Sequence, residues 1–149
     1  MPLTKADQRL RRRARARTLQ ALYAWDVAHE GTIVGVTQRV WDDMALGAEE
    51  RAFATPLVRM LEAYGASIDT TLADLTTNWR LERLGAIERA ALRLGAAELM
   101  YNGSEEREPT PPRVTIQETV LLTERFGSEE SARFVNGVLD ALARQLGRI

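Results

Sequence analysis

The sequence predicts an all-α protein, and three observations support this fold class. Apolar residues recur at intervals of three and four through most of the 149 residues, the spacing that gathers them on one face of a helix. No segment alternates apolar and polar residues for long enough to form a β-strand. Capping residues and glycines divide the chain into six or seven helical segments. We therefore expect one compact bundle of six or seven helices, with residues 1–149 forming a single domain and no internal repeat.

The first predicted helix covers residues 5–30. Thr4 and Asp7 have the spacing of a capping box, and Gly31 is a suitable stop. Six arginines fall within residues 9–17, and at 100° per residue they surround the helix. We therefore expect this half of the helix to reach no core. The second half is apolar around most of its circumference, which predicts that it is deeply embedded.

Two further helical segments follow. A short helix begins at about Ile33 and ends at Gly47, because its apolar residues keep helical spacing up to that glycine. The next segment, residues 48–77, keeps the same rhythm but contains two residues that strain a helix. Pro56 either kinks the helix or starts a new one. Gly65 is a second weak point.

A linker around Trp79 precedes a helix expected over residues 86–101. The apolar periodicity of this helix is imperfect near its end, where Glu98 falls on the apolar face. Residues 102–113 are dense in proline, glycine, serine and charge, which predicts an exposed loop.

The last third of the chain contains two more predicted helices. Thr115 and Glu118 have capping-box spacing and open the first of them, which Gly127 closes. Ser128 caps the second helix. Its expected core stripe consists of Ala132, Val135, Leu139 and Leu142.

Composition excludes several classes of function. The chain has no cysteine, so disulfides, thiolate metal sites and cysteine nucleophiles are absent. No apolar run is long enough for a membrane span or a secretory leader, and we expect a cytoplasmic protein. His29 is the only histidine, and no glycine-rich phosphate loop or nucleophile motif occurs. The sequence therefore predicts no catalytic residue, no metal and no cofactor.

The charge is distributed unevenly along the chain. Residues 1–17 carry a net charge of +6, whereas the rest of the chain carries −7. A basic segment on an acidic body is typical of a protein that meets a polyanion at one place. A solvated helix end that only aids solubility remains the alternative at this point.

Three motifs resemble the bacterial transcription antitermination factors of the NusB family. They are RRRARARTLQALYAWD at 11–26, NWRLERLGAIERAALRLGAAEL at 78–99 and RVTIQETVLLTERFGSEESARFVNGVLDALAR at 113–144. FVNGVLD within the third motif is the most specific. Residues 32–77 match only in helical character and length, and Pro56 sits where the family usually continues a helix.

The resemblance implies an all-α fold of two small helical subdomains and a role that is not enzymatic. With NusE, a small-subunit ribosomal protein, the family binds boxA RNA in nascent transcripts, notably those of ribosomal RNA operons. The complex then loads onto RNA polymerase. The sequence leaves open whether this chain also forms a homodimer.

The resemblance also implies functional residues. The arginine-rich start would bind phosphates of the RNA backbone, which gives affinity without sequence information; it contains Arg11, Arg12, Arg13 and Arg15. Tyr23 and Phe134 match positions where an aromatic ring can stack on a base. Glu88 matches an acid near the RNA, although a helix-capping acid is the alternative.

Other positions in these motifs favour structural roles. We expect Arg93 to hold neighbouring acids as readily as RNA, and Asn136 and Gly137 to serve close helix packing. Gln117 and Glu124 replace an asparagine and a lysine usual in the family. Both changes fall near the surface that the resemblance assigns to NusE.

Two other functions remain open. The same module resembles the N-terminal domain of ribosomal RNA cytosine methyltransferases, but no glycine-rich strand-turn-helix for a methyl donor follows here, which favours the stand-alone factor. A purely protein-binding adaptor would require the arginines to be incidental. Such an adaptor should not retain RNA at moderate salt.

Overall fold

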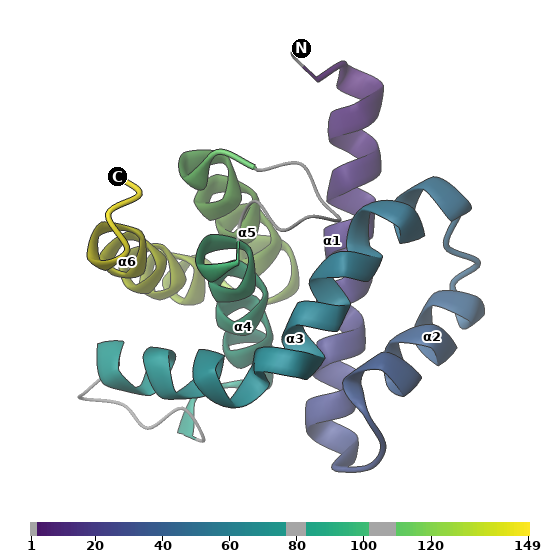
Figure 1. Cartoon of the computed structure of the whole chain (residues 1–149), viewed down its shortest axis with the longest axis horizontal. Helices are drawn as coiled ribbons and strands as arrows, with labels where there is room; N and C mark the ends of the chain where they lie inside the picture. The colour runs from purple at the N-terminus through teal and green to yellow at the C-terminus, as the bar shows by residue number, and fades with distance from the viewer. Residues whose placement is uncertain (1–2, 77–82, 102–109) are drawn as a thin grey trace.

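The computed structural model describes residues 3–76, 83–101 and 110–149 of the chain. These residues form six α-helices and no strand (Figure 1). The fold class and the bundle architecture predicted from the sequence are confirmed. In chain order the helices are α1 (Lys5–Ala28), α2 (Ile33–Asp43), α3 (Ala48–Leu75), α4 (Ala86–Met100), α5 (Pro112–Phe126) and α6 (Glu129–Gln145).

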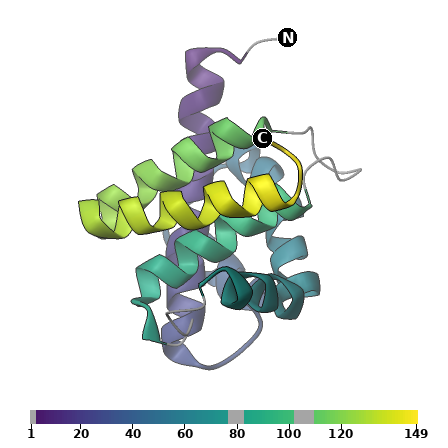
Figure 2. The ribbon, with the colours of Figure 1, turned by 90° about the vertical axis from the view of Figure 1, so that its left-hand side faces the viewer.

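The helices pack in two groups that share one core. In the first group α1, α2 and α3 contact one another, and in the second α4, α5 and α6 do so. Helix α4 joins the groups because it also packs on α1 and α3. Figure 2 shows α5 and α6 lying side by side across the middle of the molecule. The buried apolar residues of both groups form a single cluster.

Helix α1 begins with the predicted capping box. The Asp7 amide donates to the Thr4 hydroxyl, and the Thr4 amide donates to the Asp7 carboxylate, both at 3.1 Å. These hydrogen bonds lower the pKa of Asp7. The helix ends at Ala28 because His29 adopts a left-handed conformation at φ 55°. Its first turns project beyond the other helices, as Figure 1 shows near the N-terminus.

Helix α1 enters the core earlier than the arginines suggest. Ala14, Arg15 and Ala16 are buried, so the expectation that the first half of the helix reaches no core is wrong from residue 14 onward. Ala14 and Ala16 have small side chains, which lets neighbouring helices approach α1 closely. The second half is not embedded on all sides either, because Tyr23 and Val27 are exposed.

Helix α3 continues through Pro56 without a break. The only residue with non-helical dihedrals inside it is Tyr64, at φ −116° and ψ 17°, so the bend lies beside Gly65. Pro56 is buried in the core and removes only its own N–H from the helical hydrogen bonds. The glycine predicted as a weak point therefore marks the kink, and the proline does not.

Helix α4 approaches α5 and α6 through Gly95. A Cβ at this glycine would lie 2.6 Å from Leu139 Cδ1 and 3.3 Å from Thr119 Cγ2, so any side chain there would force the buried Leu139 to shift. The packing role expected for Asn136 and Gly137 is wrong. Asn136 is exposed, and a Cβ at Gly137 would meet open space.

Helix α5 starts three residues before the predicted capping box. Pro111 is its N-cap and Pro112 its first residue, because proline's fixed φ and missing N–H suit the first turn of a helix. Thr115 is consequently inside the helix and buried, and Glu118 is free to pair elsewhere. Gly127 ends α5 and Ser128 caps α6, as predicted. The four residues of the expected α6 core stripe are all buried.

Two predicted segments, a linker and a loop, fall largely outside the residues that the structure describes. The linker around Trp79 lies partly outside the described residues, and residues 102–109 of the predicted loop lie outside them entirely. The described end of that loop corrects the prediction, because Thr110 is buried and Pro112 and Arg113 belong to α5. Within the described ranges, no helix is long and apolar enough to cross a membrane.

Candidate nucleic-acid interface

Two exposed arginines of α1 are paired with acids of the helix bundle. Arg12 donates to Glu118 of α5 from Nε at 2.8 Å and from Nη2 at 3.1 Å. Arg13 donates to Glu50 of α3 from Nε at 3.3 Å and from Nη2 at 3.0 Å. The hydrogen bond and charge of Glu118 raise the pKa of Arg12. These arginines are therefore exposed but held in place by the bundle.

Arg15 is not part of this exposed set, which corrects its assignment as a phosphate-binding residue. Its side chain is 2% exposed and forms two hydrogen bonds with Glu98 of α4, at 2.8 and 2.9 Å. Burial alone would lower the pKa of Arg15, but the Glu98 carboxylate outweighs burial and raises it. The acid that disturbs the apolar pattern of α4 thus exists to pair a buried guanidinium.

Arg11 and Arg15 share one aromatic partner on α3. Their guanidinium carbons lie 4.9 and 5.0 Å from the centroid of the Phe53 ring, within the range of cation–π attraction. Arg11 is half-buried, whereas the side chains of Arg12 and Arg13 are 54% and 53% exposed. Of the predicted arginines, Arg12 and Arg13 are consequently the most accessible to an external phosphate.

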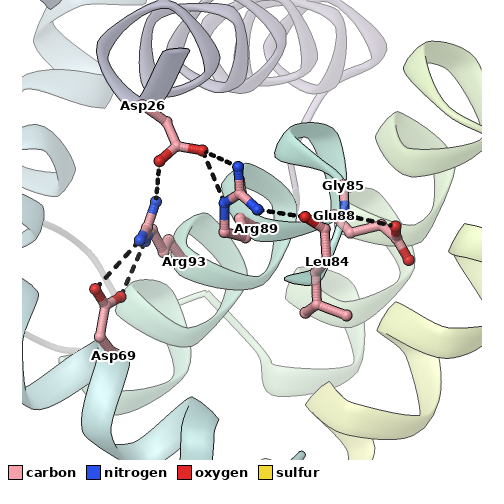
Figure 3. A network of polar contacts seen from close by, with 7 residues as sticks. All are labelled: Asp26, Asp69, Leu84, Gly85, Glu88, Arg89 and Arg93. Carbon is pink, nitrogen blue, oxygen red and sulfur yellow. Dashed lines mark hydrogen bonds and ion pairs between the residues drawn. The ribbon is translucent and has the colours of Figure 1, made fainter. Parts of the chain in front are cut away.

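A second ion-pair network joins α4 to α1 and α3 (Figure 3). Arg89 pairs with Asp26 at 2.8 Å, and Arg93 lies between Asp26 at 3.4 Å and Asp69 at 2.9 Å. Arg93 also lies over the Trp25 ring. Arg93 therefore holds neighbouring acids, which is the structural role expected as one of its two alternatives.

Glu88 serves as a helix cap. Its Oε1 accepts a hydrogen bond from the Gly85 amide at 3.1 Å, so it stabilises the N-terminus of α4. Its carboxylate points away from Arg89 and Asp26 in Figure 3. Glu88 is half-buried. The capping alternative is shown, and a contact with RNA stays a prediction.

Tyr23 is placed where a ring can meet a ligand. It is 41% exposed and lies eleven residues after Arg12, about three turns or 16 Å further along the same face of α1. Asp26, three residues later, pairs with Arg89 in the first turns of α4. The last turns of α1, which carry Tyr23, therefore pack near the first turns of α4.

Phe134 is half-buried on α6 and packs against the core. Helix α6 starts near the same end, because a Cβ at Gly127 would lie 3.4 Å from Ile87 Cγ2 of α4. In the described part of the chain no hydrogen bond or ion pair joins Tyr23, Glu88 and Phe134 directly. The start of α6 thus lies near the start of α4, and the three side chains form no polar cluster among the described residues.

A shallow groove between α5 and α6 contains none of the α1 arginines, although Arg113 of α5 lines it. It encloses about 310 Å³ and includes Gln117, Leu121 and Asp140 along its walls, with Ile149 at the C-terminus. Leu121 is 40% exposed. The Gln117 substitution noted in the sequence therefore faces an apolar groove. Glu124, the other substitution, is exposed on α5.

Most partners of the arginines could not be recognised from the sequence. Phe53, Asp26 and Asp69 fit ordinary helical patterns, and no local signal distinguishes them. Glu98 was detectable, because a carboxylate on an apolar stripe requires a buried partner. Among the described residues no group of acids and histidine could hold a metal ion.

Fold and surface together define the class of protein. It is an all-α bundle that presents exposed arginines and a tyrosine on one face of its first helix and anchors those arginines to acids of neighbouring helices. The NusB family model matches residues 12–144, and the chain belongs to the NusB family.

The relatives support this assignment over almost their whole length. "Transcription antitermination protein NusB" of Anaeromyxobacter sp. (strain Fw109-5) is 42% identical over 137 residues, covering 91% of both chains. The protein of the same name from Sorangium cellulosum (strain So ce56) is 40% identical over 135 residues, covering 91% of this chain and 92% of that protein.

Solved structures agree with the sequence relatives. A crystal structure of antitermination factors NusB and NusE in complex with dsRNA has a TM-score of 0.79 and 30% identity, over 92% of this chain and 98% of that one. T. maritima NusB has a TM-score of 0.80 and 28% identity, over 90% of each chain.

Proposed function

We propose that this protein is a transcription antitermination factor that binds boxA-type single-stranded RNA together with NusE. The pair then joins the antitermination complex on RNA polymerase in the cytoplasm, and the protein acts by binding, without catalysis. Support comes from the family membership and from the similar structure that contains NusB, NusE and RNA. The observation that carries the proposal is the exposed Arg12 and Arg13 pair on the same helix as Tyr23.

Different residues would contact the phosphates and the bases of the RNA. Arg12 and Arg13 present guanidinium forks that fit phosphate oxygens. Arg11, which lies over the Phe53 ring, would add its positive charge to the electrostatic attraction for phosphates. Contacts of this kind supply affinity and position but carry no base information. We assign no phosphate contact to Arg15, because its guanidinium is occupied and buried.

Base recognition would come from the C-terminal end of the exposed face of α1 and from the neighbouring helices. The exposed Tyr23 ring can stack on an unpaired base, and the Glu88 carboxylate can accept hydrogen bonds from base amino groups. Phe134 would contribute the exposed part of its ring. About 16 Å separates Arg12 from Tyr23 along α1. A single strand that crosses both would therefore extend over several nucleotides.

NusE would dock on the acidic remainder of the protein. Outside residues 1–17 the chain carries a net charge of −7, which suits a basic ribosomal protein. The groove between α5 and α6 adds apolar surface around Leu121. A docked basic partner would extend the positive surface available to RNA.

Fluorescence anisotropy with a labelled boxA-type RNA tests the proposal. We expect the protein to bind this RNA at moderate salt and to bind a permuted sequence of the same length more weakly, since phosphate contacts are common to both and base contacts are not. A purely protein-binding adaptor would retain neither RNA. Equal binding of both sequences would remove the base-recognition role of Tyr23, Glu88 and Phe134.

A further inference from the structure

We propose that Glu118 and Glu50 compete with RNA for the arginines of α1, so that RNA phosphates must displace two intramolecular carboxylates to bind. This inference rests on the proposed function, because it concerns the affinity of the same RNA surface. It assigns a role to two acids outside the RNA-binding set. The ion pairs that order the arginines in the free protein are then exchanged for ion pairs with RNA.

The geometry of the Arg12 pair carries the argument. Glu118 accepts two parallel hydrogen bonds, one on each carboxylate oxygen, from Nε and Nη2 of Arg12. A phosphate group engages the same fork of a guanidinium through two of its oxygens. The two acceptors therefore use the same N–H groups and cannot be bound in full at once.

Burial decides which partner moves in this exchange. The side chains of Glu118 and Glu50 are only 14% and 13% exposed, whereas those of Arg12 and Arg13 are 54% and 53% exposed. The carboxylates are fixed in the bundle, and the arginines form the outer, solvated half of each pair. A phosphate arriving from solvent can thus take the guanidinium without opening the core.

The two acids should hold their arginines with different strength. Arg13 directs both of its N–H groups at one oxygen of Glu50, at 3.3 and 3.0 Å. Glu50 is also in the first turn of α3, where the helix dipole stabilises its charge after Arg13 leaves. Glu118 is in the middle of α5, away from the helix dipole's positive end, and holds Arg12 through both of its oxygens; the nearby Arg15 charge also acts on it. Arg12 is therefore the more tightly held of the two.

The test measures RNA affinity of the full chain with Glu118→Gln, using a boxA-type single strand at low salt. We expect binding to tighten about two- to five-fold, the effect of removing one exposed ion pair that opposes binding. The gain should shrink as salt is added, because salt screens the internal pair as well as the RNA contacts. Glu50→Gln should act in the same direction with a smaller gain.

Two controls separate competition from a general charge effect. Glu49→Gln removes the same charge beside Glu50, from an exposed carboxylate that forms no ion pair in the described ranges, and should change affinity less. In an Arg12→Ala background, Glu118→Gln should no longer tighten binding. Thermal unfolding of each variant checks folding, and Glu50→Gln serves as the test if Glu118→Gln does not fold.

The outcomes distinguish this inference from the proposed function. Unchanged or weaker binding by folded Glu118→Gln, with wild-type binding intact, would overturn competition alone, and weaker binding would make Glu118 a positioning partner of Arg12. Equal tightening with and without Arg12 would overturn it as well, since the effect would then be one of net charge. Failure of the wild-type protein to bind any RNA would overturn the proposed function and this inference with it.

Discussion

Arg15 and Glu98 form a fully buried ion pair that ties α1 to α4, with two hydrogen bonds of 2.8 and 2.9 Å between their side chains. Replacing Glu98 by alanine leaves the Arg15 charge buried without its partner. We expect this change to lower the free energy of unfolding by about 3–5 kcal/mol in urea titration. The paired replacement Arg15→Met with Glu98→Leu should cost much less, because it removes both charges. A loss below about 1 kcal/mol for Glu98→Ala would mean that water reaches the pair.

Two glycines of the packed helices should respond to alanine in opposite directions. At Gly95 the added methyl group would overlap Leu139 on α6, so we expect Gly95→Ala to destabilise the fold by about 1–3 kcal/mol. At Gly137 the methyl group meets open space, and alanine favours the helix by about 0.5–1 kcal/mol. Thermal unfolding of Gly95→Ala and Gly137→Ala measures both changes in stability. Stabilisation by Gly95→Ala would contradict the close approach of α4 and α6.

The helices were predictable from sequence because their signals are local. The caps at Thr4 and Ser128, the stop at Gly127 and the α6 core stripe depend on residues a few positions apart. The capping-box pattern at Thr115 failed for an equally local reason. Pro112 starts a helix in its own right, and the pattern therefore falls inside α5.

The site was only partly predictable, because its character depends on residues distant in sequence. Six arginines look alike along α1, yet Arg15 is buried against Glu98, 83 positions away, and Arg12 meets Glu118, 106 positions away. Helical periodicity reports which face of one helix is apolar and not which helix covers it. Gly95 and Gly137 illustrate the same point. The sequence around each glycine does not show whether another helix packs against it, and only Gly95 has such a neighbour.

The exposed arginines should set the salt dependence of RNA binding. We expect Arg12→Ala with Arg13→Ala to weaken binding to all single strands alike and to flatten the slope of log K against log salt by about 0.7 per lost phosphate contact. Stability should fall by no more than about 1 kcal/mol per variant, the usual upper value of an exposed ion pair. Arg39→Ala, an exposed arginine on α2, is the matched control. An unchanged slope in the double variant would exclude both arginines from the RNA surface.

Phe134 combines packing with a proposed base contact, and Phe134→Leu separates the two. Leucine retains apolar bulk against the core, so we expect a stability loss below about 1.5 kcal/mol. It cannot stack on a base, and RNA affinity should fall by about 1–3 kcal/mol. Anisotropy titration and urea unfolding measure the two quantities on the same sample. Full RNA affinity in the leucine variant would assign the ring to the core alone.

RNA and NusE should bind this protein cooperatively, and a titration of NusE measures the coupling between them. The cognate NusE is titrated into this protein with and without saturating boxA-type RNA, at one fixed salt concentration. The basic partner on the acidic bundle should give positive coupling of about 1–3 kcal/mol, and linkage requires RNA to tighten the protein pair by the same factor, about 5- to 150-fold. We expect this tighter NusE binding in the presence of RNA, and equal affinities in the two titrations would contradict cooperative binding.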